Sequence, residues 1–101
     1  MVGTSPLVCR EFVETDDYAR SRADLIKQTG LTIEQIDDRV SALEWALARG
    51  DNDEEGSVVP VPNRDIWVAV LPVGIPPLRL YLRPCRSTEH RCEWLWIEEI
   101  P

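Results

Sequence analysis

The most regular hydrophobic pattern lies in LTIEQIDDRVSALEWALARG, residues 31–50. Apolar side chains recur there at intervals of three and four, the spacing that gathers them on one face of a helix: Ile33, Ile36, Val40, Leu43 and Leu47. Thr32 is expected to cap this helix together with Gln35, each side chain bonding to the backbone of the other. Gly50 is the expected stop. The pattern therefore predicts an amphipathic helix that begins after Thr32.

A second helical pattern comes before it. Thr15 is a suitable N-cap, and Asp16 and Asp17 follow where the positive end of a helix dipole favours acids. Only residues 30–32 (GLT) separate the two patterns, and so short a connection predicts an antiparallel helical hairpin. Between Thr15 and the left-handed stop expected at Gly30, the side chains at helical spacing are Tyr18, Arg22, Leu25, Ile26 and Thr29.

The other apolar segments are short and rich in strand-forming residues. Pro60 favours a sheet edge for its segment, because proline cannot donate to a ladder. The order strand, helix, helix, then three or four strands predicts one α+β domain over residues 1–101. We expect the order β-α-α-β-β-β, the helical hairpin on one face of a small, mostly antiparallel sheet, and flexible segments at 1–6 and 51–57. The predicted strands are LVCREFV (7–13), SVVPV (57–61), DIWVAVL (65–71), LRLYLR (78–83) and CEWLWI (92–97).

The segment LRLYLR carries two kinds of side chain. Because strand residues alternate between faces, its leucines should face the helices while Arg79, Tyr81 and Arg83 face away. Guanidinium groups bind phosphate or carboxylate oxygens through two parallel hydrogen bonds, so this patch is a candidate site for an anionic ligand. The alternative is an ordinary strand face on which the arginines pair with Glu93 or Glu98 of the next strand.

Tryptophans supply candidate partner-binding residues. Strict alternation puts Trp94 and Trp96 on one face of their strand with Cys92, opposite Leu95 and Ile97. Both faces then carry large apolar groups, and one of them needs a cover. Trp45 falls on the side of its helix opposite the apolar stripe. Such residues often anchor interfaces, so a second copy or another protein is one expected cover, and the N-terminal strand is the other.

The charge distribution and the lengths of the apolar segments bear on whether the protein binds nucleic acids or a membrane. The net charge is −7, and residues 1–56 hold thirteen acids against six bases, whereas residues 57–101 hold five of each. An acidic half disfavours general nucleic-acid binding, although a local basic patch would still work. No stretch approaches the roughly 20 apolar residues of a membrane span, and the N-terminus has no secretory pattern. We therefore expect a cytoplasmic protein without a membrane partner.

Three cysteines and one histidine raise the question of redox or metal chemistry. An odd cysteine count is typical of free thiols in a reducing compartment. A Cys85–Cys92 disulfide across the last hairpin is one alternative, and a zinc site that adds His90 and Cys9 is another. Zinc sites usually contain Cys-x-x-Cys pairs, which the chain lacks, so we expect free thiols, no metal and no cofactor. By its chemistry alone, His90 is also a candidate general acid or base.

In layout and local sequence the chain resembles the RelE/ParE superfamily of bacterial toxins from type II toxin–antitoxin modules. GLTIEQIDDRVSALEWALARG is similar to the family's second helix, and DIWVAVLPVGIPPLRLYLR is similar to its paired central strands. In the ribonuclease branch, strand arginines stabilise phosphate during cleavage of ribosome-bound mRNA. The resemblance implies this role for Arg79, with Arg64 and Arg83 as further matches. If RNA is cleaved on this face, Tyr81 or His90 is expected by its chemistry to transfer the proton.

Departures from the ribonuclease pattern favour the ParE-like branch of the superfamily. The single lysine, Lys27, is on the first helix, and DNDEEG stands where some family ribonucleases carry basic residues. The chain also ends WLWIEEIP, without the tyrosine or histidine that acts as acid near the C-terminus of the family's ribonucleases. ParE-like inhibition of DNA gyrase does not depend on these groups. The resemblance therefore implies a toxin component, gyrase-inhibitor-like or detoxified, that acts mainly through protein–protein contacts.

This interpretation implies an antitoxin partner, a target such as gyrase or the ribosome with its mRNA, and, as a further expectation, a homodimer. One alternative is a metal-independent, ribosome-dependent endoribonuclease that uses the Arg79, Tyr81 and Arg83 face, with His90. A non-toxic structural or adaptor domain is the other. The candidate partner-binding residues are Trp45, Arg64, Arg79, Arg83, Trp94 and Trp96.

Overall fold

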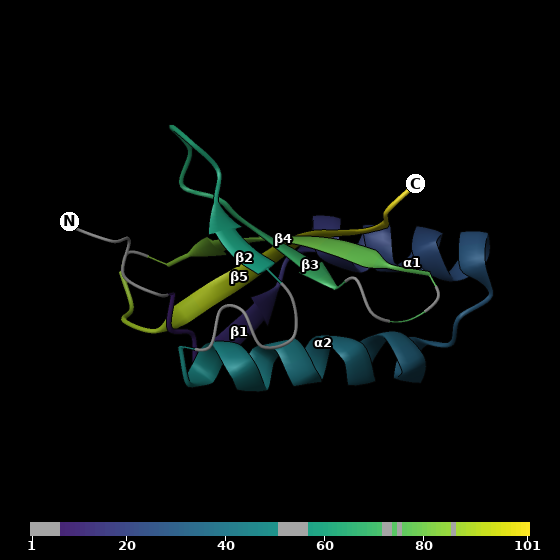
Figure 1. Ribbon diagram of the computed structural model, residues 1–101, viewed down its shortest axis with the longest axis horizontal. Helices are drawn as coiled ribbons and strands as arrows, with labels where there is room; N and C mark the ends of the chain where they lie inside the picture. Colours follow the sequence, from purple (N-terminus) through teal and green to yellow (C-terminus); the bar gives the residue numbers. More distant parts are fainter. Residues whose placement is uncertain (1–6, 51–56, 72–73, 75, 86) are drawn as a thin grey trace.

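Two helices and a five-stranded mixed sheet form an α+β fold (Figure 1), as the sequence predicts. The computed structural model describes residues 7–50, 57–71, 74, 76–85 and 87–101. The segments 1–6 and 51–56, expected to be flexible, lie outside these residues, whereas Ser57 opens a strand. In chain order the elements are β1 (Glu11–Glu14), α1 (Asp16–Thr29), α2 (Ile33–Ala48), β2 (Ser57–Pro60), β3 (Trp67–Leu71), β4 (Leu78–Pro84) and β5 (Arg91–Glu99).

Both helices begin where their capping residues predict. The Tyr18 backbone N–H donates to the hydroxyl of Thr15, and Gly30 ends α1 with a φ of 76°. Thr32 and Gln35 form the expected reciprocal capping box at the start of α2. Ile33 departs from the prediction because its side chain is 42% exposed. It stands one turn ahead of Ile36, where α2 enters the core.

The sheet has the strand order β1-β5-β4-β3-β2. β1 runs parallel to β5, and the other neighbours are antiparallel. Pro60 lies in the edge strand β2, as predicted. β1 starts later than the predicted residue 7, because the preceding backbone bonds elsewhere: Cys9 N–H donates to the Leu47 carbonyl, and Arg10 N–H to that of His90.

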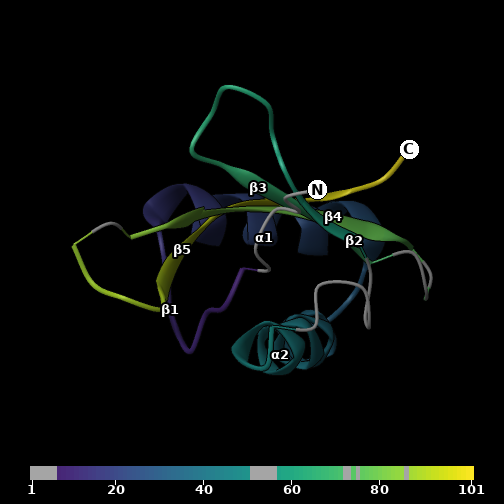
Figure 2. The ribbon, with the colours of Figure 1, turned by 60° about the vertical axis from the view of Figure 1, so that its left-hand side comes forward.

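The core lies between the helices and one face of the sheet, which we call the inner face. The two helices run in opposite directions; α2 passes below the sheet and α1 lies beside β5 (Figures 1 and 2). Leu78, Leu80 and Leu82 are fully buried, which confirms the predicted alternation of β4. They share the core with Tyr18 and Leu25 of α1 and with Ile36, Val40, Leu43 and Leu47 of α2.

A β-bulge corrects the predicted faces of β5. Tyr81 pairs with Trp96, whereas its neighbour Leu82 pairs with Trp94, so Leu95 is an extra residue. An extra residue reverses the alternation of side chains beyond it. The prediction that Trp94 and Trp96 share a face was therefore wrong: Trp94 is 1% exposed and Trp96 is 40% exposed.

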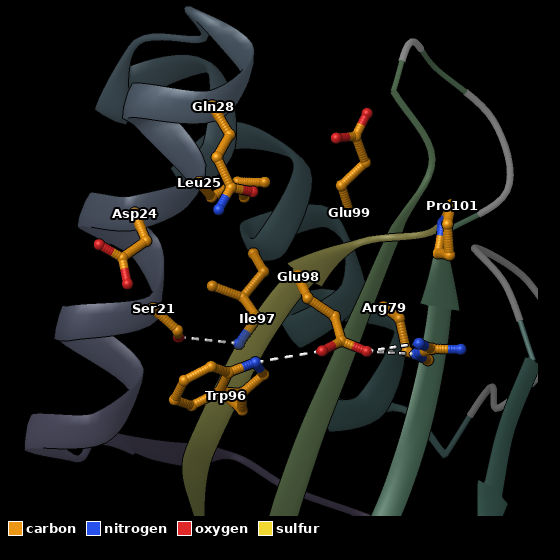
Figure 3. A pocket seen from close by; sticks show the side chains of 10 residues that line it. All are labelled: Ser21, Asp24, Leu25, Gln28, Arg79, Trp96, Ile97, Glu98, Glu99 and Pro101. Carbon is orange, nitrogen blue, oxygen red and sulfur yellow. Dashed lines mark hydrogen bonds and ion pairs between the residues drawn. The ribbon is translucent and has the colours of Figure 1, made fainter.

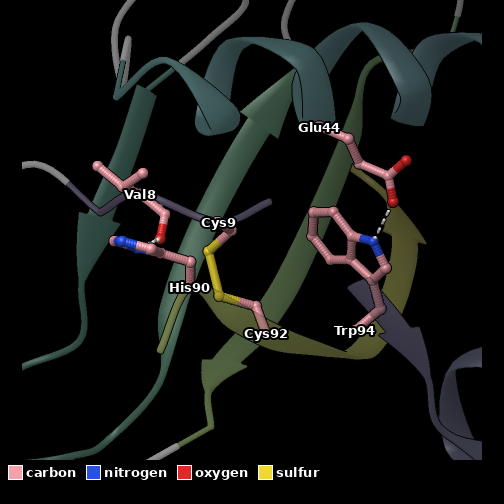
Figure 4. Close-up of a disulfide and its surroundings, with 6 residues drawn as sticks. All are labelled: Val8, Cys9, Glu44, His90, Cys92 and Trp94. Atoms are coloured by element: carbon pink, nitrogen blue, oxygen red, sulfur yellow. Dashed lines mark hydrogen bonds between the residues drawn. A yellow bond between two sulfur atoms is a disulfide. The ribbon is translucent and has the colours of Figure 1, made fainter. Parts of the chain in front are cut away.

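A disulfide joins Cys9 to Cys92 (Figure 4), so the prediction of free thiols was wrong for these two residues. Both are buried in the core, and Cys85 keeps a free thiol. The Cys85–Cys92 alternative is not formed, because Cys92 is bonded to Cys9 and lies opposite Pro84 in the ladder. Within the described ranges, no group of three or more His, Cys, Asp or Glu side chains is arranged to hold a metal ion.

Among the described residues, neither α1 nor α2 has the length and apolar character that a bilayer-spanning helix needs. The longer helix, α2, has 16 residues, and its sequence includes acids at Glu34, Asp37, Asp38 and Glu44.

Candidate functional site

The face of the sheet opposite the core carries a row of apolar side chains across four strands. Val59 pairs with Val68, Val68 with Tyr81, and Tyr81 with Trp96, so the four residues lie side by side. We call them the outer row. Val59 is 50% exposed, and Trp96 reaches this face because of the bulge. The outer row is an accessible aliphatic and aromatic strip of the kind that anchors protein interfaces.

Two ion pairs lie on either side of the outer row. Arg79 Nε donates to Glu98 Oε2 at 2.7 Å, and Arg83 donates to Glu93 Oε1 through Nε at 3.1 Å and Nη2 at 2.9 Å. These are the cross-strand pairs that the alternative interpretation of LRLYLR predicts. Glu98 also accepts from the Tyr81 hydroxyl and the Trp96 indole N–H, both at 3.2 Å (Figure 3 shows the Trp96 bond).

These contacts set the chemistry of the face. Burial and the Glu98 carboxylate raise the pKa of the Tyr81 hydroxyl, so Tyr81 is a neutral hydrogen-bond donor near pH 7. The hydrogen bond to Glu98 raises the pKa of Arg79 further. Each guanidinium already faces a carboxylate, so the positive charge available for a phosphate is largely cancelled.

A cavity of about 410 Å³ opens where α1 lies beside the end of β5 (Figure 3). Sequence reasoning identified Arg79 and Trp96 but missed the contribution of α1. Asp24 and Gln28 stand one helical turn apart, but nothing in their pattern indicates which strand α1 accompanies. The lining residues are Ser21, Asp24, Leu25, Gln28, Arg79, Trp96, Ile97, Glu98, Glu99 and Pro101.

His90 lies in the turn before β5, away from the strand positions of Arg79 and Tyr81. Its φ is 61°, and its Nδ1 is 3.2 Å from the Val8 carbonyl oxygen (Figure 4). Its Nε2 is 3.2 Å from a carboxylate oxygen of Glu89. The structure thus places His90 against the N-terminal segment, and the predicted proton-transfer group is not brought together with the arginines.

The other candidate partner-binding residues fall on different surfaces. Trp45 is 61% exposed on α2, as predicted, and the Arg49 guanidinium carbon lies 3.3 Å from its ring centroid. Arg64 is exposed in the turn between β2 and β3. The prediction of Trp94 as a partner-binding residue was wrong, because Trp94 is buried. Its ring stacks on Phe12, and its indole N–H donates to Glu44 at 2.8 Å.

Comparison with known proteins adds no functional assignment. No protein family, curated protein or solved structure matches this chain. The RelE/ParE resemblance therefore stays a prediction.

Proposed function

We propose that this chain is a RelE/ParE-like toxin component of a toxin–antitoxin module that acts in the cytoplasm by binding other proteins through the outer row. The pairing of Arg79 with Glu98 and of Arg83 with Glu93 carries this proposal. It leaves the face with balanced charge and an apolar centre. Such a surface fits a polypeptide better than a phosphodiester, whose recognition depends on uncompensated positive charge.

The antitoxin is the expected occupant of the outer row when the toxin is held inactive. An extended or helical segment laid across the four strands would bury Val59, Val68 and Trp96, while its polar groups meet the two ion pairs at the rim. The β-α-α-β order and the strand series that follows support this assignment at the level of layout. The toxic target, under this proposal, is a protein such as DNA gyrase.

Bacterial expression separates this function from its two alternatives. We expect the chain expressed alone to arrest growth, and the product of an adjacent, co-directional reading frame to relieve the arrest. The Arg79→Ala/Arg83→Ala double variant should still arrest growth, because a toxin that acts by protein binding through the outer row does not need the two guanidinium groups as catalytic charges. Loss of arrest in this variant would favour the ribonuclease, and no arrest by the unmodified chain would favour the adaptor domain.

A tryptophan pair provides a matched binding test. Trp96→Ala should weaken binding to the antitoxin by about tenfold or more, because exposed tryptophans at the centre of an interface often carry 2 kcal/mol or more. Trp45→Ala removes an equally large exposed ring from α2 and should leave this affinity within about twofold. Titration calorimetry on the folded variants measures both. Equal losses would contradict the outer row as the antitoxin surface.

A further inference from the structure

The cavity beside β5 continues the outer row past its last strand. The outer row ends at Trp96 on β5, and Trp96 also lines the cavity. Next to it, the backbone N–H of Ile97 donates to the Ser21 hydroxyl at 3.0 Å, so α1 lies against the edge of β5 at this level. A segment laid along the outer row towards β5 therefore reaches the cavity next, between Trp96 and α1 (Figure 3).

The cavity combines apolar and polar lining. Trp96 is 40% exposed, and its indole N–H donates to Glu98, so the ring is held in place on the outer face. Asp24 and Gln28 of α1 and Glu99 of β5 also line the cavity, and all three are exposed. Within the described residues, no hydrogen bond or ion pair engages the carboxylates of Asp24 and Glu99. Such a lining suits a side chain with a long apolar stem and a charged end.

The outer face changes in character across its strands. Val59 of β2 and Val68 of β3 form the aliphatic end of the outer row. Both arginines of the flanking ion pairs lie on β4 and both glutamates on β5, so these charges cancel in pairs. The charge that stays unbalanced is at the β5 end, where Asp24 and Glu99 are both negative. A complementary partner is apolar over β2 and β3 and basic over the cavity.

We infer that the polypeptide bound on the outer row places a lysine or arginine side chain in this cavity. The inference rests on the proposed function, because it gives the chemistry of the partner of the same surface. The stem of the basic side chain packs on the Trp96 ring, and its charged end reaches the carboxylates of Asp24 and Glu99. A neutral side chain leaves these carboxylates without a partner, and a free cation makes no contact with the outer row.

NMR titration of the full chain with a defined peptide tests the inference. The outer row spans three strand spacings, about 14 Å, and five extended residues reach about 17 Å. The probe is therefore acetyl-Arg-Leu-Gly-Leu-Arg-amide, with arginine at both ends because either direction of the segment fits the face. Its matched control carries the neutral isostere citrulline at both ends.

Both peptides should shift the amide signals of Val59 and Val68, but only the arginine peptide should saturably shift the side-chain amide signal of Gln28, which lines the cavity. Equal shifts of Gln28 with both peptides, or no shift with either, would overturn the inference. Shifts confined to Val59 and Val68 would do so while leaving the outer row as a binding surface. The titration needs neither antitoxin nor growth arrest, so failure of the toxin function is distinguishable from failure here.

Paired variants identify the carboxylates that bind the arginine. Asp24→Asn/Glu99→Gln removes two exposed charges and keeps Trp96, and it should weaken binding of the arginine peptide about tenfold or more. Binding of the citrulline peptide should stay within about twofold. Glu34→Gln/Asp38→Asn removes two exposed charges from α2, outside the cavity, and should leave both affinities within about twofold. Equal weakening by the two double variants would show a general effect of net charge and overturn the site.

Two further measurements distinguish the other occupants. Free methylguanidinium should bind at least about tenfold more weakly than the arginine peptide, because it lacks contact with the outer row. Equal affinities would indicate a small-cation site. Dilution of the protein without peptide should leave the signals of Gln28 and Val59 unchanged, whereas concentration-dependent shifts of both would assign the face to a second copy of the chain. Either contrary result would overturn the inference.

Discussion

Glu44 is a partly buried carboxyl whose ionisation costs free energy in the folded protein. Burial is the main cause that raises the pKa of its carboxyl, the nearby Glu14 and Asp37 raise it further, and the Trp94 hydrogen bond lowers it only partly. The pKa of this carboxyl therefore lies above its ordinary value of 4.5, so the folded protein holds a proton on this group to higher pH than the unfolded chain does. Ionised Glu44 thus opposes folding.

The pH dependence of stability follows from this sign. A raised pKa stabilises the fold while the group is protonated, and the contribution is lost as pH rises through the folded value. At pH 7 we therefore expect Glu44→Gln to melt at a higher temperature than the wild type. Below about pH 4, where both states bind the proton, the difference should disappear. Thermal melts followed by circular dichroism across this range measure it.

Asp38→Asn is the control, because it removes the same charge from an exposed position on the same helix, beyond the first turn where the helix dipole acts. A general effect of net charge would raise the melting temperature of both variants equally. That result, or a lower melting temperature for Glu44→Gln at pH 7, would contradict a specific cost of burying Glu44.

At the scale of elements, the sequence predicts what is decided locally. Thr15, Thr32 and Gln35 cap helices through bonds within three residues, so their pattern alone places the helix starts. The bulge at Leu95 depends on how β5 meets β4, which a period of two does not contain. The sequence therefore predicts the outward side chains of β4 and their possible pairing with Glu93 and Glu98. It does not predict that Trp96 lies beside Tyr81, because the position of Trp96 depends on that bulge.

The disulfide is likewise a product of tertiary contact. Cys9 and Cys92 are 83 residues apart, and they meet because the segment before β1 lies beside the start of β5. Sequence spacing alone suggested only the nearer Cys85 as an alternative partner for Cys92. The wrong prediction of free thiols came from applying a rule about cysteine counts to a pair that only the fold brings together.

Removing this link should destabilise the protein. We expect Cys9→Ala/Cys92→Ala to lower the free energy of unfolding by about 2–5 kcal/mol, because the unfolded chain regains the freedom that the cross-link removes. Urea denaturation of both proteins, with and without dithiothreitol, measures the difference. The reductant should lower the stability of the wild type towards that of the double variant and leave the variant unchanged.

Cys85→Ala is the matched control. Cys85 has a free, partly exposed thiol, and its substitution should change stability by less than about 0.5 kcal/mol. If the double variant were as stable as Cys85→Ala, the Cys9–Cys92 link would contribute nothing to the fold.

At the scale of the whole molecule, the first half of the chain carries the excess negative charge, and the outer face of the sheet carries balanced charge. The excess acids lie in residues 1–56, which include both helices, whereas the outer face combines acids and bases in pairs. A partner of the outer row is therefore expected to bring apolar side chains.

Nucleic-acid binding tests this distribution. We expect no change in the fluorescence anisotropy of a labelled single-stranded RNA at up to about 100 μM protein in physiological salt, because Arg79 and Arg83 are already paired. Glu93→Gln/Glu98→Gln frees both arginines on the same fold and should produce measurable, salt-sensitive binding. Tight RNA binding by the unmodified chain would instead favour the ribonuclease alternative.

The bond between Cys9 and Cys92 also makes most of the chain a covalent ring. Both helices and strands β1 to β4 lie between its two cysteines, and only the ends of the chain extend from it. A protease that cuts one peptide bond between these residues therefore opens the ring without releasing a fragment. Under oxidising conditions the nicked protein remains one molecule, and its two pieces can still refold together because they share that tether.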